Sequence, residues 1–156
     1  MTTRLNVLEA QPEAYQAMLG LERYLATSPL PKRTLELVKL RASQINGCAF
    51  CVDMHSHDLR ADDETDERLF SVVTWREAPW FTPAERAALA LTEQATRLDP
   101  QGVTDEVWTE ATEHYDPPTL AALVTAIATI NAWNRFGVAL RLEPGSQRKG
   151  AATASV

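Results

Sequence analysis

The 156-residue sequence has few of the residues that build disulfide-stapled or sheet-rich proteins. It contains only two cysteines, Cys48 and Cys51, and only six glycines. A bond between cysteines three positions apart closes a loop too short to restrain the unfolded chain, which excludes a disulfide-stapled framework. No glycine lies in a tight turn between alternating apolar residues, and no repeat of 20 to 50 residues is evident. These absences argue against a sheet-rich or repetitive fold.

Basic residues and long apolar runs are also scarce. Fifteen basic residues stand against 21 acidic ones, for a formal charge of -6, so no basic face for nucleic acid or anionic lipid is expected. The longest apolar run, Leu120 to Trp133, is shorter than the roughly 18 to 20 residues that span a bilayer. It predicts a buried helix. The first residues lack the apolar core of a secretory signal, and we expect a cytoplasmic protein.

Apolar residues recur three and four positions apart along most of the chain, the period of amphipathic helices. Thr82-Pro83-Ala84-Glu85 is typical of a helix start, with a capping box and proline in the first turn. The sequence therefore predicts one all-α domain, a helical bundle of six to seven helices over residues 1–143, and a disordered tail over 144–156. The expected helices are Pro12–Ala26, Lys32–Ile45, Cys48–Arg60, Thr65–Val73, Thr82–Arg97, Asp105–His114 and Pro118–Leu142.

The chemistry of the chain is concentrated between Glu36 and His57, which read ELVKLRASQINGCAFCVDMHSH. Asn46-Gly47 favours the end of one helix there, because both residues tolerate a left-handed backbone. On the helix that follows, Cys48, Cys51 and His55 are three and four positions apart and share one face.

A thiol reacts as its thiolate, whose formation is favoured at a helix N-terminus or beside a histidine. One thiolate of such a pair can attack a peroxide and become a sulfenic acid, which the second thiol converts to a disulfide. His55 is placed to carry a proton, and Glu36 on the preceding helix to orient it. Alternatively, Glu36 forms an ion pair with Lys39 or Arg41 on a solvated edge.

Two other interpretations of the paired cysteines are weaker. Cys48, Cys51 and His55, with one of His57, His114 or Glu36, could bind zinc. Structural zinc sites usually draw two ligand pairs from different parts of the chain, and the sequence offers no second pair. The cysteines could also be inert buried residues.

The stretch ELVKLRASQINGCAFCVDMH resembles the core signature of alkylhydroperoxidase D, within the carboxymuconolactone decarboxylase superfamily. The later segments WREAPWFTPAERAALA and INAWNR are similar to those of its smaller members, so the resemblance extends over about residues 15–142. It implies an all-α, alkylhydroperoxidase D-like fold that assembles as a homo-trimer or homo-hexamer. It also implies an oxidoreductase, a thiol peroxidase acting on small organic hydroperoxides without a bound cofactor.

The resemblance also implies roles for the four site residues. Cys51 matches the cysteine that attacks the peroxide and Cys48 its disulfide partner, while His55 and Glu36 match the proton relay. A helix N-terminal position would by itself favour Cys48 as the more acidic thiol, against this assignment. An external dithiol, such as a lipoylated adaptor protein, is the implied reductant. Phe50 replaces a histidine that the best-known member carries between its cysteines, which leaves proton delivery to His55 and Glu36.

Two further functions remain open from the sequence. The pair could serve a non-catalytic redox sensor or disulfide-exchange protein, because Phe50 removes a possible relay residue. A lactone decarboxylase is disfavoured, since the true decarboxylases of the superfamily lack the paired cysteines. The shared fold alone does not decide the activity.

Overall fold

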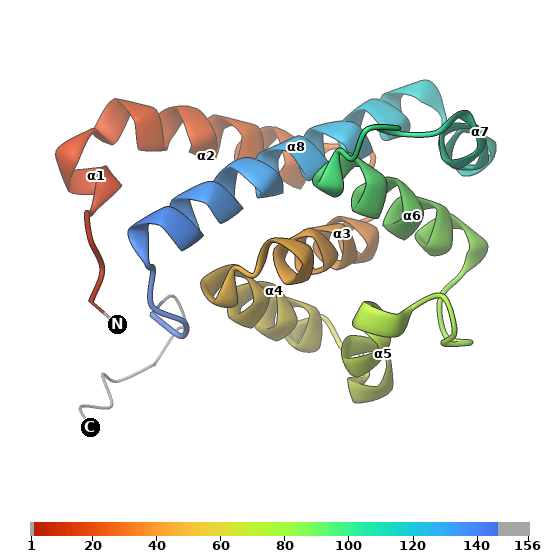
Figure 1. Cartoon of the computed structure of the whole chain (residues 1–156), viewed down its shortest axis with the longest axis horizontal. Coiled ribbons are helices and arrows are strands. Elements are labelled where there is room, and N and C mark those ends of the chain that lie inside the picture. The colour runs from red at the N-terminus through yellow and green to blue at the C-terminus, as the bar shows by residue number, and fades with distance from the viewer. Residues whose placement is uncertain (1, 147–156) are drawn as a thin grey trace.

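The computed structural model describes residues 2–146 of the chain, and these residues form eight α-helices, one 3-10 turn and no strand (Figure 1). The all-α prediction is therefore confirmed. The helices are α1 (Val7–Ala10), α2 (Pro12–Thr27), α3 (Lys32–Asn46), α4 (Ala49–Ala61), α5 (Asp66–Ser71), α6 (Pro83–Arg97), α7 (Asp105–His114) and α8 (Pro117–Leu140), with the 3-10 turn η1 (Val72–Thr74) after α5.

The boundaries differ from the predicted ones at a few chain positions. Helix α1 was not predicted, because a four-residue helix with no buried residue leaves no periodic apolar pattern. Helix α8 ends at Leu140 and not Leu142, since Arg141 adopts a left-handed conformation with a φ of 55°. Of the predicted disordered tail, only residues 144–146 are described, in a turn; 147–156 lie outside the described residues. The domain boundary stays a prediction.

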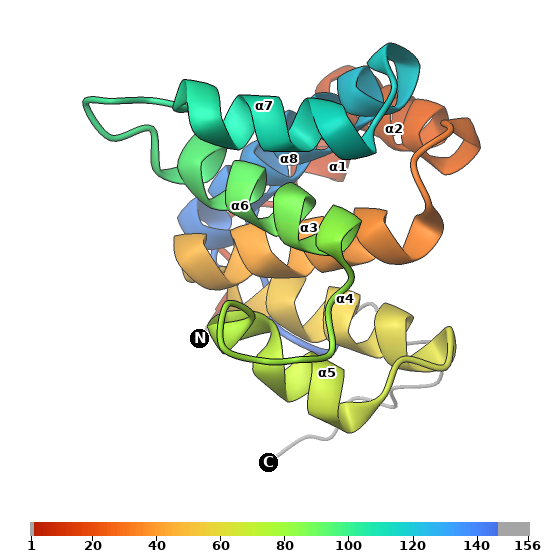
Figure 2. The ribbon, with the colours of Figure 1, turned by 90° about the vertical axis from the view of Figure 1, so that its right-hand side faces the viewer.

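Helix α3 is the central element of the bundle. Figure 1 shows α8 on one side of it and α4 on the other, and Figure 2 shows α6 and α7 stacked beyond it. Every residue from Thr34 to Ser43 is buried, including three charged residues in the middle of the helix. A helix enclosed on all sides in this way was expected from its apolar residues on more than one face. Its buried charges must find partners from neighbouring helices.

The apolar run Leu120–Trp133 lies within α8, as predicted for a buried helix. Leu123, Ala126 and Ile130 on this helix are buried, the first two against α3, α6 and α7 side chains in the largest apolar cluster. Within residues 2–146 no helix has both the length and the apolar character needed to cross a membrane.

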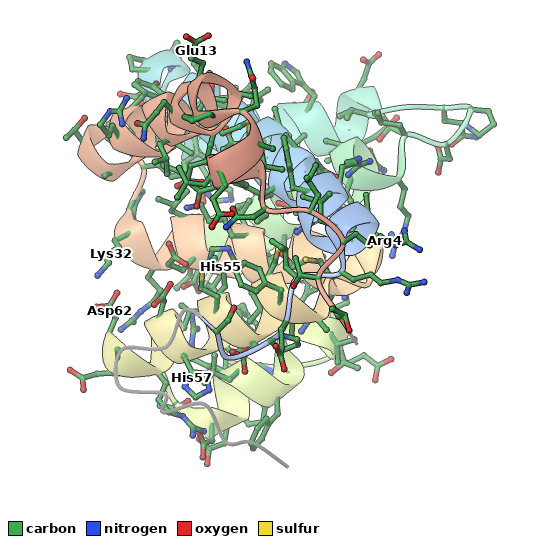
Figure 3. The ribbon with its side chains drawn as sticks, turned by 90° about the vertical axis from the view of Figure 1, so that its left-hand side faces the viewer. Arg4, Glu13, Lys32, His55, His57 and Asp62 are labelled. Atoms are coloured by element: carbon green, nitrogen blue, oxygen red, sulfur yellow. The ribbon has the colours of Figure 1, made fainter. Side chains whose placement is uncertain are left out.

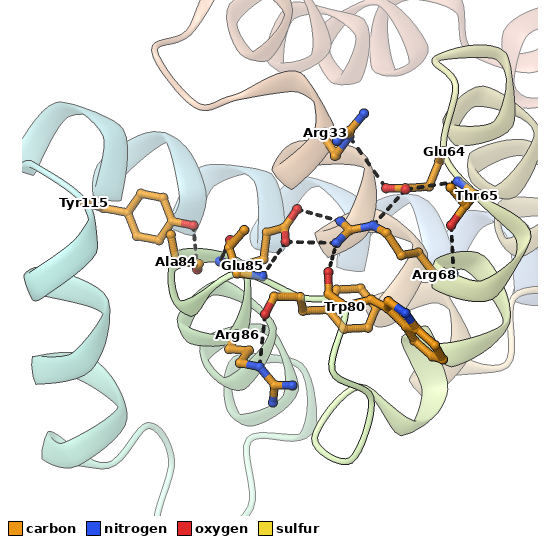
Figure 4. Close-up of polar contacts among 11 residues, drawn as sticks. Arg33, Glu64, Thr65, Arg68, Trp80, Ala84, Glu85, Arg86 and Tyr115 are labelled. Carbon is orange, nitrogen blue, oxygen red and sulfur yellow. Dashed lines mark hydrogen bonds and ion pairs between the residues drawn. The ribbon is translucent and has the colours of Figure 1, made fainter.

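A buried ion-pair network joins α5 to α6 and fixes the edge of the bundle (Figure 4). The Arg68 guanidinium donates to Glu64 Oε1 at 2.8 Å and to Glu85 Oε1 at 2.7 Å. Glu85 also completes the predicted capping box, because its Oε2 accepts the Thr82 N–H at 2.8 Å. Tyr115 adds a link from the C-terminal end of α7, with its hydroxyl donating to the Ala84 carbonyl at 2.7 Å. The Glu85 carboxylate thus both caps the start of α6 and pairs with Arg68 of α5.

Candidate active site

The turn between α3 and α4 positions the two cysteines. Gly47 has a φ of 67°, the left-handed conformation predicted for the end of α3. The chain then reverses, and the Cys48 N–H donates to the Ser43 carbonyl at 3.0 Å. Cys48 is therefore the N-cap of α4 and not its first helical residue, and its Sγ accepts the Cys51 N–H at 3.4 Å. Both sulfurs lie where the unpaired N–H groups of a helix start favour negative charge.

Both thiols are free and shielded from solvent. Cys48 is 1% and Cys51 2% exposed, and they form an apolar cluster with Ala42 and Ile130. Phe50 and Trp133 are partly buried and pack against this cluster. Phe50, which lies between the two cysteines in the sequence, thus forms part of the wall around the sulfurs.

Helix α8 closes the other side of the dithiol with a glycine. A Cβ placed on Gly137 would lie 2.5 Å from Cys48 Sγ and 3.5 Å from Cys51 Sγ. No real Cβ approaches a sulfur as closely as the first of these distances. Glycine is therefore the residue that lets α8 approach both sulfurs without displacing them.

The two thiols differ in acidity. A hydrogen bond from the Cys51 thiol lowers the pKa of Cys48 to about 7, and backbone N–H groups and the Asn134 amide add to this effect against the opposing influence of burial. Hydrogen bonding to Cys48 raises the pKa of the Cys51 thiol, and burial and the Cys48 charge act in the same direction. The reduced pair therefore places its first negative charge on Cys48 and keeps a proton on Cys51.

His55 and Glu36 lie together, as their place on adjacent helices suggested. His55 Nδ1 is 2.7 Å from Glu36 Oε2, and both residues are buried. Figure 3 shows His55 where α3 and α4 meet. Burial raises the pKa of Glu36, but the hydrogen bond to His55 and the nearby positive charges outweigh it and hold the pKa below its ordinary value. His55 Nε2 is buried and has no hydrogen-bond partner in the structure, so this nitrogen is free to exchange a proton with a reacting group.

Glu36 does form an ion pair within its own helix, but it is not on a solvated edge. Lys39 Nζ lies 3.8 Å from Glu36 Oε1, and the side chains of both residues are largely buried. Arg41 instead pairs with Glu93 on α6, with 2.7 Å between Nη2 and Oε1. The carboxylate is thus both desolvated and paired.

The described residues do not gather the ligands of the zinc hypothesis. Within residues 2–146, the one group of three acidic, histidine or cysteine side chains whose ligand atoms lie within 4.8 Å of one another is Glu36, His55 and Asp58. Neither cysteine belongs to it. His57 lies on the outer surface of α4, where its side chain is half exposed and 3.8 Å from Asp53 (Figure 3). This geometry argues against a shared cysteine and histidine metal centre.

Several residues that support the site were not singled out from the sequence. Asn134 on α8 donates to Ser43 Oγ at 3.0 Å and accepts from Asn46 Nδ2 at 2.8 Å, beside the cysteines. On the other side, Glu22 on α2 accepts from Lys39 Nζ at 2.7 Å. The segment INAWNR contains Asn134, but no spacing rule connects it with residues about 90 positions earlier.

Known proteins match this chain over most of its length. Residues 12–94 match the model of the carboxymuconolactone decarboxylase family. The uncharacterized protein YdfG of Bacillus subtilis is 40% identical over 140 residues, covering 90% of this chain and 95% of its own. ATU0492 of Agrobacterium tumefaciens, a protein of unknown function grouped with the AhpD antioxidant defence proteins, has a TM-score of 0.88 at 38% identity, covering 92% of this chain and 98% of its own.

A more distant structure shares the fold alone. The debrominase Bmp8 has a TM-score of 0.80 at 19% identity and covers 89% of this chain and 75% of its own. The family match and the two relatives of 40% and 38% identity establish which family the chain belongs to, and the dithiol at a helix start agrees with it. The chain belongs to the carboxymuconolactone decarboxylase family and is an AhpD-like protein within it.

Proposed function

We propose that this protein is a thiol peroxidase that reduces small organic hydroperoxides through a Cys48–Cys51 disulfide cycle. The observation that carries the proposal is a buried dithiol with one acidic thiol, one helical turn from a histidine that is paired with a carboxylate. A thiolate, a second thiol and a proton carrier are what peroxide reduction requires. The description of ATU0492, 38% identical to this chain, as an antioxidant defence protein AhpD agrees with this chemistry.

In the proposed cycle the Cys51 thiol transfers its proton to His55 and attacks the terminal oxygen of the hydroperoxide. The S–O bond forms, the O–O bond breaks, and the departing alkoxide takes a proton from His55 to become the alcohol. The Cys48 thiolate then attacks the Cys51 sulfenic acid, forming the disulfide and releasing hydroxide, which a solvent proton converts to water. The substrate has gained two electrons and the dithiol has lost two.

This order of attack gives His55 and Glu36 a specific task. Because Cys48 holds the first negative charge, Cys51 needs a base before it can act as the nucleophile. Glu36 is ionised beside His55 and stabilises the imidazolium that forms. A dithiol reductant, for which a lipoylated adaptor is the expected source, then reopens the disulfide by exchange. A cytoplasmic homo-trimer or homo-hexamer remains the expected form of the protein.

The proposal is tested by multiple-turnover reduction of an organic hydroperoxide with dihydrolipoamide as the electron source. We expect activity in wild type, loss in Cys51→Ser and Cys48→Ser, and a strong decrease in His55→Ala. His57→Ala is the matched control, because it removes an exposed histidine from the same helix and should leave turnover unchanged. If wild type and all variants consume peroxide at the uncatalysed rate, the proposal that the protein is a thiol peroxidase is refuted.

The roles of the cysteines are tested by trapping the sulfenic acid with dimedone. After one equivalent of peroxide, Cys48→Ser should carry the adduct on Cys51, and Cys51→Ser should carry none. The reverse pattern would make Cys48 the attacking thiolate, as its lower pKa alone would favour.

The redox-sensor alternative gives a different result in the same assay. A sensor consumes one equivalent of peroxide and changes its assembly on oxidation, which size-exclusion chromatography of the reduced and oxidised protein measures. Because Phe50 supplies no proton carrier between the cysteines, Phe50→His should increase turnover if the protein is an enzyme.

A further inference from the structure

Lys39 is a buried cation beside the candidate proton relay. It is 5% exposed and lies on the same helix as Glu36, one turn away. Its Nζ is 2.7 Å from Glu22 Oε2 and 3.8 Å from Glu36 Oε1. A buried charge is costly unless it is paired, so this ammonium depends on both carboxylates.

The four ionisable side chains form a chain of alternating charge when His55 is protonated. It runs from His55 to Glu36, Lys39 and Glu22, with the distances given above joining each neighbouring pair. The side chain of Glu22 is 28% exposed, whereas that of Lys39 is 6% exposed. The chain therefore begins at the dithiol side of α4 and ends at solvent on α2.

Glu22 is also tied to the wall of the dithiol site. Its second carboxylate oxygen, Oε1, accepts the Trp133 indole N–H at 3.0 Å. The Trp133 ring packs against the apolar cluster that contains both cysteines. One carboxylate from α2 thus holds the buried cation with one oxygen and an aromatic wall of the site with the other.

These contacts have an electrostatic consequence for proton transfer. Without Glu22, the uncompensated charge of Lys39 would oppose protonation of His55 and favour thiolates. Without Lys39, two carboxylates would face each other across the relay and disfavour thiolates. We propose that the Glu22–Lys39 ion pair is the outer half of the relay and that these two positioning residues set the charge balance in which the dithiol ionises.

Other charged groups facing the relay do not replace this pair. Lys32 of α3 acts on Glu36, but it is exposed and 2.6 Å from Asp62. Asp58 of α4 also faces Glu36 and His55, and burial followed by the charge of Glu36 raises the pKa of this carboxyl. From α8 the neutral indole of Trp133 contacts the outer carboxylate, Glu22. Lys39 is therefore the buried cation in contact with Glu36.

The inference rests on the proposed function for its purpose, but its test does not require peroxidase activity. The ultraviolet absorbance of the thiolate, measured against pH in the reduced protein, gives the midpoint at which the first thiol ionises. We expect Glu22→Gln to lower this midpoint and Lys39→Met to raise it, each by about 0.5 to 1 pH unit. Lys39→Arg keeps the charge and should restore the wild-type midpoint.

The exposed ion pair between Arg60 and Asp66 supplies matched controls. Asp66→Asn and Arg60→Met make the same charge changes as the two test variants, but at the surface, where solvent screens them. Their midpoints should stay at the wild-type value.

Shifts in the same direction, or shifts equal to those of the surface controls, would overturn the inference. A purely structural ion pair would lower stability in both variants without moving the midpoint in opposite directions. If Lys39→Met does not fold, the inference is decided by comparing the thiolate midpoint of Glu22→Gln with that of Asp66→Asn. If wild type lacks peroxidase activity while the midpoints shift as expected, the proposed function fails and the charge relay stands.

Discussion

Replacing Gly137 with alanine has two opposite effects on stability: it raises the helix propensity of α8, and it places a methyl group in the space that the two sulfurs occupy. In the interior of a helix, alanine is normally more stable than glycine by about 0.5 to 1 kcal/mol. At this position the new Cβ would lie 2.5 Å from Cys48 Sγ, and a second sulfur would lie within 3.5 Å. We expect the steric term to exceed the propensity term.

The magnitude follows from how little the sulfur can move. Cys48 is 1% exposed and accepts the Cys51 N–H, so turning its side chain away would sacrifice the cap of α4. Forcing an extra methyl into a closed core costs about 1 to 3 kcal/mol. After the gain in propensity is subtracted, Gly137→Ala should be less stable than wild type by up to about 2.5 kcal/mol. Loss of the N–H contact should also raise the pH at which Cys48 ionises.

Urea unfolding of the reduced proteins, followed by circular dichroism, measures the change in stability. Gly20→Ala on α2 is the control, because its Cβ would meet no atom closer than 3.7 Å, from the flexible end of Arg23. That variant should gain about 0.5 to 1 kcal/mol. If Gly137→Ala gains as much stability over wild type as Gly20→Ala does and its thiolate midpoint is unchanged, the proposed contact between α8 and the sulfurs is refuted.

Three further predictions concern residues around the site and the core. Arg76, Trp75 and Arg41, which all contact the Glu93 carboxylate, outweigh its burial and lower its pKa from 4.5 to about 2, which corresponds to about 3 kcal/mol of stability. Because the pKa of Glu93 is lower in the folded than in the unfolded protein, this stability is present above pH 4.5 and is lost as the pH falls toward 2. Urea unfolding should therefore show that Glu93→Gln is most destabilised near neutral pH and less so on acidification. Asn134→Ala should raise the thiolate midpoint by about 0.5 pH unit in the absorbance titration, whereas Asn131→Ala should not; equal shifts would contradict a direct effect of the Asn134 amide. Thr82→Ala should lower the unfolding free energy by about 1 kcal/mol through loss of the α6 capping box, and an unchanged value would show that Glu85 alone satisfies the helix start.

The local features of the fold could be predicted because their causes are local. The period of the apolar residues indicated helices, and Asn46-Gly47 and the capping box at Thr82 fixed two of their ends. The end of α8 was missed by two residues, because a left-handed arginine is not a pattern that residue preferences reveal.

Four residues of the candidate site, Glu36, Cys48, Cys51 and His55, lie within 20 positions of one another, on two consecutive helices. Their spacing alone placed the dithiol at a helix start with a histidine one turn away. The partner of Glu36 was undecided from the sequence, since Lys39, Arg41 and His55 were all within reach. The tertiary structure decided it: Glu36 contacts both His55 and Lys39, whereas Arg41 pairs with Glu93 of α6.

Tertiary structure alone decided what surrounds these four residues. Glu22 comes from α2, and Asn134 and Gly137 come from α8, about 90 residues after the dithiol. Helix periodicity describes which side chains share a face, but it contains nothing about which helix covers that face. The sequence therefore determined the reactive groups and the two helices that carry them, whereas packing determined the acidity of each thiol, the space left for the sulfurs and the outer charges of the relay.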